Sequence, residues 1–249
     1  GNVIETYELD DNSSISEKVK ASKNVEIEWQ NTSIKERCRL LVKVAGLLLD
    51  RKEQYGELMT KEMGKPILQS ISEIEKCAWA CDFYAVNAEQ FLSDAIIDTD
   101  AEESFISYDP LGCILAIMPW NYPFWQVIRF AAPTLTAGNT AILKHARNVP
   151  GCAQALEQLF LDAGYPKGCF QNILTNHKEI EHLIANDHIK AVTLTGSEKA
   201  GKGIAKVAGA QLKKTVLELG GNNACVVFDD ANLDEHIDTM VKARMQNTG

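Results

Sequence analysis

Glu218 is the first candidate for chemistry, because it stands at the end of an apolar stretch that predicts a buried strand. It follows Val216 and Leu217 and precedes Leu219 and two glycines. A carboxylate in this place can be a general base whose pKa is raised by burial, or a structural acid whose charge is satisfied. The two glycines allow ligand or chain atoms to approach closely. The residues alone leave both interpretations of Glu218 open.

A second candidate is Asn121, which lies in the sequence M-P-W-N-Y-P at positions 118–123. This turn follows the apolar run 112–117, which is typical of a buried strand. Its two prolines fix the backbone and remove two N–H donors. Asn121 is therefore held in a rigid turn from which its side-chain amide can be directed at another group.

The segment after the apolar run 189–195 predicts a binding site for an anion. Gly196 and Ser197 form a tight turn and a helix N-cap, and the unpaired amides of the following helix favour phosphate. The spacing G-x-x-x-x-G-K nearly matches a P-loop, but Gly203 stands where Ser or Thr would hold magnesium. This difference argues against a P-loop phosphotransferase, and an ordinary capped helix is the remaining alternative.

Two cations, Lys144 and Arg147, follow the apolar run 140–143. At the end of a strand they can contact ribose hydroxyls or phosphate. A solvated loop explains the same residues, so the pair indicates a binding site only together with other features.

The second half of the chain alternates apolar runs with helical patterns. Strands are predicted at 112–118, 140–143, 170–174, 189–195, 216–219 and 224–228, and helices at 124–137, 150–163, 178–185, 198–208 and 233–246. Such alternation predicts an α/β fold with a mostly parallel sheet covered by helices on both faces. Ligands of such sheets bind at the carboxyl ends of the strands, where these candidates lie.

The first hundred residues read mainly as helices. Ser33 and Glu36 form a capping box at the start of one helix. Pro66 is well placed to start the next, which fades near residue 93. The segment 102–109 predicts an exposed strand, with Phe105 and Ile106 among polar residues.

Composition limits the classes of partner. The chain has 249 residues, 45% of them hydrophobic, and a formal charge of -9, with no long basic run, so nucleic acid and anionic membranes are not expected as partners. We see no membrane span and no signal-peptide pattern, and we predict a cytoplasmic location. The seven cysteines lie mostly in apolar patterns and predict reduced core thiols. Cys77 and Cys81 could pair on a metal, but they lack a second ligand pair, and we expect no metal.

Taken together, the motifs resemble the aldehyde dehydrogenase superfamily, and within it most closely the succinate-semialdehyde dehydrogenases. The resemblance rests on M-P-W-N-Y-P, the strand-end Lys144, T-G-S-x-x-x-G at 195–201 and E-L-G-G at 218–221, in the same order and spacing. It extends to E-M-G-K-P at 62–66 and D-P-L-G at 109–112. It implies a Rossmann-like, NAD(P)-binding domain with N-terminal helices and a strand arm.

The resemblance also implies a chemistry. In this family a cysteine thiolate attacks the aldehyde, a thiohemiacetal oxyanion forms, hydride moves to the nicotinamide, and a glutamate-activated water hydrolyses the thioester. By motif, Asn121 would donate to the oxyanion and Glu218 would activate the water. The cofactor would be bound at its adenosine ribose by Lys144 and at its pyrophosphate by Ser197, and the same cofactor site would include Trp120, Gly196, Gly201 and Leu219.

Two arginines bear on specificity. Arg129 occupies the place at which succinate-semialdehyde dehydrogenases bind the distal carboxylate of the substrate, so the resemblance implies a small aldehyde acid, with a surface salt bridge as the alternative. Arg147 stands where NAD-preferring members often have Glu. A cation there would attract a 2′-phosphate, so within NAD(P) we slightly favour NADP, with a plain surface role as the alternative.

The nucleophile of the family would lie beyond Gly249, and none of the seven cysteines matches it. We therefore expect residues 1–249 to be an incomplete NAD(P)-binding domain that lacks the catalytic domain and is inactive by itself. A nucleotide-binding module without catalysis and a CoA-acylating relative remain alternatives. Family members are usually homodimers or homotetramers, and residues 98–111 are expected to form the oligomerisation arm.

Overall fold

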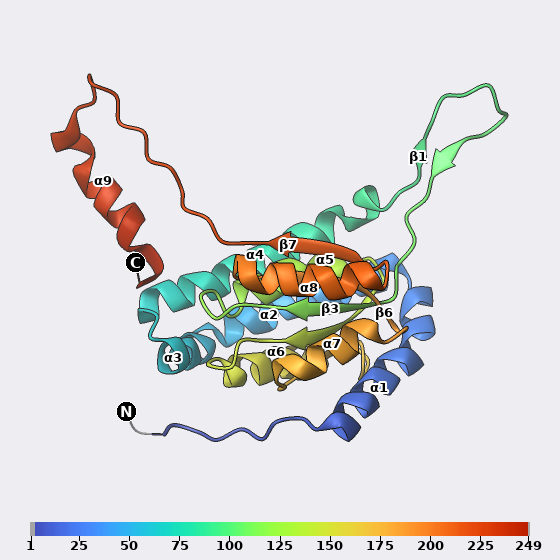
Figure 1. Cartoon of the computed structure of the whole chain (residues 1–249). Coiled ribbons are helices and arrows are strands. Elements are labelled where there is room, and N and C mark those ends of the chain that lie inside the picture. The colour runs from blue at the N-terminus through green and yellow to red at the C-terminus, as the bar shows by residue number, and fades with distance from the viewer. Residues whose placement is uncertain (1–2, 249) are drawn as a thin grey trace.

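The computed structural model describes residues 3–248, and its centre is a five-stranded parallel sheet (Figure 1). The strands are β3 (Cys113–Ile117), β4 (Thr140–Lys144), β5 (Phe170–Ile173), β6 (Ile189–Thr195) and β7 (Lys214–Glu218). Their order in the sheet is β5-β4-β3-β6-β7. The chain therefore moves outward from β3 to β5, and then returns to the other side of β3. This doubly wound parallel sheet confirms the predicted fold class.

The helices between these strands also lie where the sequence places them. They are α5 (Trp125–Thr136), α6 (Pro150–Ala163), α7 (His177–Ala185) and α8 (Glu198–Ala210). Local signals set their ends. Helix α6 begins at Pro150, whose missing N–H costs nothing in the first turn, and it is followed by Gly164 at φ 97°. Ser197 caps α8 by accepting a hydrogen bond from the Ala200 amide at 3.2 Å.

Four long helices precede the sheet: α1 (Asn12–Asn31), α2 (Ile34–Asp50), α3 (Lys52–Met63) and α4 (Ile67–Phe91). The Ser33 hydroxyl accepts from the Glu36 amide, as the capping box predicts. Pro66 lies directly before α4, also as predicted. Helices α2 to α4 belong to the core on one face of the sheet, and Ile15 and Val19 of α1 belong to the core on the other.

Two apolar cores form on the two faces of the sheet. Helices α2 to α6 pack on one face against strand residues such as Ala116 and Leu143. Helices α1, α7 and α8 pack on the other face against Leu115 and Ile142. Because strand side chains alternate between faces, neighbouring residues of β3 and β4 enter different cores. The sheet is thus held between helices on both sides.

A hairpin extends from the body between α4 and β3 (Figure 1). Its strands, β1 (Ala95–Ile96) and β2 (Phe105–Ile106), pair antiparallel, with Ala95 opposite Ile106. The strand predicted at 102–109 is therefore present but short. The hairpin overlaps the expected arm at 98–111, and its role in oligomerisation stays a prediction.

The predicted strand at 224–228 is wrong. These residues carry no strand, and Val226 and Phe228 are each 73% exposed. Strand β7 is the edge of the sheet, and the following segment leaves it without a pairing partner (Figure 1). Cys225, expected in the core, is exposed for the same reason.

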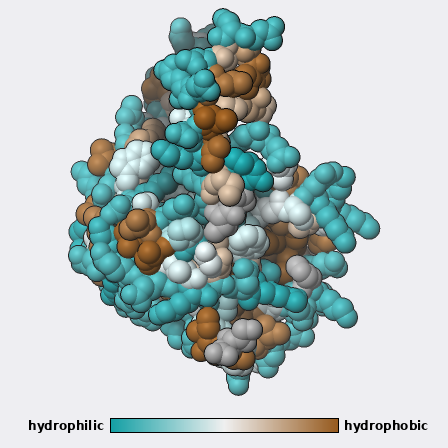
Figure 2. Space-filling view, turned by 90° about the vertical axis from the view of Figure 1, so that its left-hand side faces the viewer, coloured by the Kyte–Doolittle hydropathy of each residue, from teal (hydrophilic) through white to brown (hydrophobic). Residues whose placement is uncertain are grey.

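The last helix, α9 (Leu233–Met245), carries no buried residue. Leu233, Ile237, Val241 and Met245 follow one another at four-residue spacing, and each is at least half exposed. Figure 2 views the molecule from the side on which Figure 1 places α9, and it shows apolar side chains among hydrophilic ones on that side. Within residues 3–248, no helix is both long enough and apolar enough to span a bilayer.

Candidate active site and cofactor site

The carboxyl ends of the parallel strands bring the predicted site residues to one edge of the sheet. Lys144 pairs with Ile117, which pairs with Leu194, and Thr195 pairs with Glu218. With about 4.8 Å between neighbouring strands, the four strand ends span about 15 Å. The chain reverses its winding between β3 and β6, and such a switch point is where doubly wound sheets bind ligands.

Asn121 lies on the turn that joins β3 to α5, and it is half-buried. Its side-chain oxygen is buried without a hydrogen-bond partner among the described residues. Its main-chain carbonyl accepts a hydrogen bond from the Asn247 side-chain amide at 3.0 Å. Trp120, immediately before it, is 46% exposed. The turn thus leaves an acceptor of the Asn121 side chain unpaired, and the predicted role of its amide as a donor stays a prediction.

His145 holds this turn from the end of β4, a role that we did not predict. Its Nδ1 accepts from the Ala146 amide at 2.9 Å, so its Nε2 carries the proton and donates to the Pro123 carbonyl at 2.9 Å. Burial lowers the pKa of His145 to about 4, against smaller opposing effects of its hydrogen bonds. His145 is therefore a neutral structural link between β4 and the turn that carries Asn121.

Lys144 and Arg147 form a cationic site at the end of β4. The Lys144 side chain is largely buried, and its pKa is lowered first by burial and then by the nearby charge of Arg147. Arg147 is exposed. Within the part of the chain that the structure describes, neither cation has an ion-pair partner. Two adjacent cations without an acid fit an anionic ligand such as a phosphate-bearing cofactor.

The glycine turn after β6 is the second predicted element of an anion site. The Gly196 amide donates to the Glu218 carbonyl at 2.9 Å, which ties this turn to the end of β7. Gly201 lies against Leu219: a Cβ at Gly201 would stand 2.5 Å from the Leu219 Cδ2 atom. A glycine there lets α8 start close to the E-L-G-G segment, and the first amides of α8 are left for a ligand.

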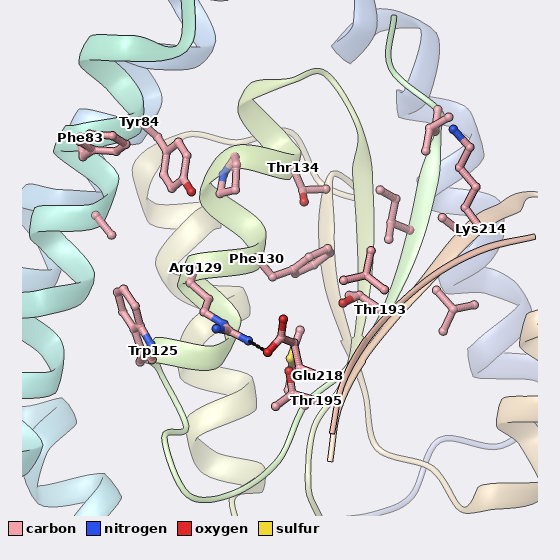
Figure 3. A pocket seen from close by; sticks show the side chains of 18 of the residues that line it. Phe83, Tyr84, Trp125, Arg129, Phe130, Thr134, Thr193, Thr195, Lys214 and Glu218 are labelled. Carbon is pink, nitrogen blue, oxygen red and sulfur yellow. Dashed lines mark ion pairs between the residues drawn. The ribbon is translucent and has the colours of Figure 1, made fainter. Parts of the chain in front are cut away.

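Glu218 lies in an environment unlike the one we predicted. Strand β7 is mostly exposed, and the Glu218 side chain is 59% exposed, so the expectation of a buried strand is wrong. The physical reason is the edge position of β7, which leaves one side of the strand without a neighbour. Its carboxylate lies 3.8 Å from the guanidinium of Arg129 on α5 (Figure 3). The surface salt bridge considered for Arg129 is therefore present, with the predicted base as its partner.

This ion pair lines a cavity of about 690 Å³ between α4, α5 and the sheet. Figure 3 shows aromatic side chains of α4 and α5 facing strands β6 and β7 across it, with Arg129 and Glu218 at one end. The lining is mainly apolar, and its charged groups are Arg129, Lys214 and Glu218. Such a cavity suits a ligand with an apolar body and one anionic end.

The cysteines are core thiols for the most part, and they are not arranged as metal ligands. Cys77 and Cys81 are buried in the core that α4 shares with α2 and α5, and all seven cysteines are free thiols. Within residues 3–248, no three His, Cys, Asp or Glu side chains converge as metal ligands would.

Comparison with known proteins places this geometry in a family. The aldehyde dehydrogenase family matches residues 1–249. A protein of Synechocystis sp. named "Probable succinate-semialdehyde dehydrogenase [NADP(+)]" is 47% identical over 249 residues, which cover 100% of this chain and 55% of the relative. A succinate-semialdehyde dehydrogenase [NADP(+)] of Mycobacterium avium is 44% identical over 222 residues, covering 88% of this chain and 47% of the relative.

A solved structure of a related enzyme has a similar fold. The crystal structure of succinic semialdehyde dehydrogenase from Streptococcus pyogenes in complex with NADP+ matches with a TM-score of 0.95 and 34% identity, over 98% of this chain and 54% of that one. The chain spans about half the length of the relatives it matches. A match to the family along the whole chain, with this sheet order and these strand-end residues, shows that the protein belongs to the aldehyde dehydrogenase family.

Proposed function

We propose that residues 1–249 form the cofactor-binding part of a longer, NADP-dependent aldehyde dehydrogenase that oxidises succinate semialdehyde to succinate. The observation that carries the proposal is the convergence of four strand ends. They bring the Asn121 turn, the Lys144–Arg147 cations, the Ser197 helix start and the Arg129–Glu218 pair to one edge of the sheet.

The proposed cofactor suits the charges at this edge. Lys144 would contact the adenosine ribose, Arg147 the 2′-phosphate, and the start of α8 at Ser197 the pyrophosphate. Trp120, Gly196, Gly201 and Leu219 would complete the site. NADP bound there would accept hydride from the substrate. The names of the relatives, which carry NADP(+), support the preference that Arg147 suggests.

Asn121 and Glu218 would act at opposite stages of the reaction. The Asn121 amide would donate to the oxyanion that forms when a thiolate attacks the aldehyde. Glu218 would take a proton from the water that hydrolyses the thioester. A carboxylate in this place favours water over CoA as the acyl acceptor, so we retain the CoA-acylating alternative only as the second candidate.

Arg129 would select the substrate. Its planar guanidinium can donate two hydrogen bonds to the distal carboxylate of a short aldehyde acid. The apolar cavity beside it would hold the carbon chain. The names of the relatives support succinate semialdehyde as that acid.

By itself, the 249-residue chain would bind the cofactor without oxidising aldehydes. Burial raises the pKa of Cys77, Cys81, Cys113, Cys152 and Cys169, that of Cys113 to about 11, so these thiols are poor nucleophiles at neutral pH. Cys225 is exposed, on the segment that leaves the sheet. The proposed nucleophile would come from the longer protein.

Two measurements test the proposal. Calorimetric titration of the 249-residue chain should show NADP binding, weakened by Lys144→Ala. The complete enzyme should form NADPH from NADP and succinate semialdehyde, and both Asn121→Ala and Glu218→Gln should abolish most of this activity. Acyl-CoA formation that depends on added CoA would favour the second candidate, and a chain that binds no dinucleotide would refute both.

A further inference from the structure

A buried ion pair lies beside the turn that carries Asn121. The ammonium of Lys65 lies 2.5 Å from Oε2 of Glu73, and the two side chains are 2% and 1% exposed. Lys65 belongs to the E-M-G-K-P motif before α4, and Glu73 lies on the second turn of that helix. Removing two charges from water is costly for each ion unless further partners stabilise them. The further partners of Lys65 and Glu73 therefore indicate which part of the structure the pair stabilises.

Glu73 holds the start of α5. Its other oxygen, Oε1, accepts from the Phe124 amide at 2.9 Å and from the Trp125 amide at 2.8 Å. The residue at the N-cap of α5 is Phe124, which offers no side-chain cap. Glu73 thus supplies, from another helix, the acceptor and the negative charge that the first turn of α5 lacks.

Lys65 holds the other half of the same turn. Its ammonium lies 3.8 Å from the centre of the Tyr122 ring, in a cation–π contact. Tyr122 directly follows Asn121 in the sequence, and Phe124 comes two residues after Tyr122. His145 donates to the carbonyl of Pro123, which lies between Tyr122 and Phe124. The three residues after Asn121 are therefore each held by a buried polar group.

We propose that Glu73, kept in place by Lys65, is a positioning residue that fixes the Asn121 amide for the oxyanion. This inference rests on the proposed function, in which Asn121 is the oxyanion donor. A donor of this kind works only within a few tenths of an ångström of its place, because it must reach the position that the oxyanion occupies. The prolines restrict the backbone within the turn, and the ion pair fixes the place of the turn relative to α4.

The chain offers a matched control in Glu62, three residues before Lys65. Glu62 accepts from the Gly151 amide at 2.7 Å and from the Cys152 amide at 2.9 Å, so it caps α6 as Glu73 caps α5. Among the described residues, no hydrogen bond or ion pair joins Glu62 to the Asn121 turn. Glu62→Gln therefore reproduces the loss of a helix-capping carboxylate without the proposed positioning effect.

The test is a double-mutant cycle in the complete enzyme, with Glu73→Gln and Asn121→Ala alone and together. We expect Glu73→Gln to lower kcat about tenfold, a part of the hundredfold or greater loss that removal of the oxyanion donor causes. KM for the aldehyde and Kd for NADP should stay within about twofold, and Glu73→Gln should have no further effect once Asn121 is Ala. Glu62→Gln should leave kcat within about twofold of wild type.

The positioning role would be overturned if the two single-variant losses in kcat multiplied in the double variant. It would also be overturned if Glu73→Gln left kcat unchanged. If Glu73→Gln does not fold, Tyr122→Leu removes the ring below Lys65 and leaves the ion pair intact. It should lower kcat by about twofold to fivefold, again only while Asn121 is present. If Asn121→Ala itself keeps full kcat, the proposed function of Asn121 fails, and the inference fails with it for that distinct reason.

Discussion

The guanidinium of Arg129 on α5 lies 3.8 Å from the carboxylate of Glu218 at the end of β7, so the expected substrate-binding group and the expected base are ion-pair partners (Figure 3). Both side chains are more than a third exposed, and exposed pairs of this kind contribute little free energy. A substrate carboxylate that reaches Arg129 can therefore displace Glu218 at small cost. Binding of an aldehyde acid would then also free the base.

The Arg129→Ala variant of the complete enzyme should discriminate poorly between aldehydes. We expect kcat/KM for succinate semialdehyde to fall about tenfold to a hundredfold relative to that for butanal, because a charge-assisted bond contributes roughly 1.5–3 kcal/mol. Steady-state kinetics with both aldehydes measure the ratio. Arg129→Lys should lose less, since it keeps the charge without the planar fork. An equal loss for both aldehydes would show that Arg129 does not bind the distal carboxylate.

The Arg147→Glu variant should change cofactor preference. Replacing a cation with an anion beside a 2′-phosphate should weaken NADP binding by about tenfold or more, while NAD, which lacks that phosphate, is little affected. Titration calorimetry of the 249-residue chain with each dinucleotide gives both Kd values. Lys43→Glu makes the same charge change on the exposed side of α2 and should alter neither. A wild-type chain without a preference for NADP would refute the assignment.

The parts of the fold that the sequence predicts are those with local signals. Strand β6 begins and ends at the predicted residues, Ile189 and Thr195, because its apolar run is bounded by polar and glycine residues. Helix α6 is bounded by Pro150 and Gly164 for the same kind of reason. The predicted site residues lie at one edge of the sheet because a parallel sheet brings its carboxyl ends together whatever the details of packing, and their roles stay predictions.

The parts that could not be predicted depend on distant neighbours. An apolar run such as 224–228 reads as a strand, but it becomes one only if another strand pairs with it, and here none does. The exposure of Glu218 has the same origin in the edge position of β7. Glu73 and His145 were missed because charged or polar residues usually face water. The one available signal was that Glu73 shares the helical stripe of the apolar residues Cys77 and Ala80.

Two glycine substitutions should shift stability in opposite directions. Gly168 has φ +98°, and a Cβ there would stand 2.6 Å from the Ala21 carbonyl oxygen of α1. Gly168→Ala should therefore lower the free energy of unfolding by about 2 kcal/mol or more, because the left-handed conformation alone costs 1–2 kcal/mol and the clash adds to it. Urea unfolding of the 249-residue chain measures the change.

Gly46→Ala is the matched control. Gly46 lies inside α2, and a Cβ there meets nothing within 4 Å. Alanine should raise the free energy of unfolding by about 0.5–1 kcal/mol, since it restricts the unfolded chain and favours the helix. Equal effects of the two substitutions would contradict the close approach of Gly168 to α1.

The buried His145 should make the chain less stable as the pH falls. Its pKa is lowered from 6.5 to about 4 in the folded protein, so between these values the unfolded chain binds a proton that the folded chain does not. Stability therefore falls as the pH drops below about 6.5, and the loss from this group is complete below about 4, reaching about 3 kcal/mol. Urea unfolding across this range should show a smaller acid-dependent loss in His145→Gln than in wild type. His236→Gln, on the exposed helix α9, should keep the wild-type dependence, and a wild-type slope in His145→Gln would mean that other groups cause the acid sensitivity.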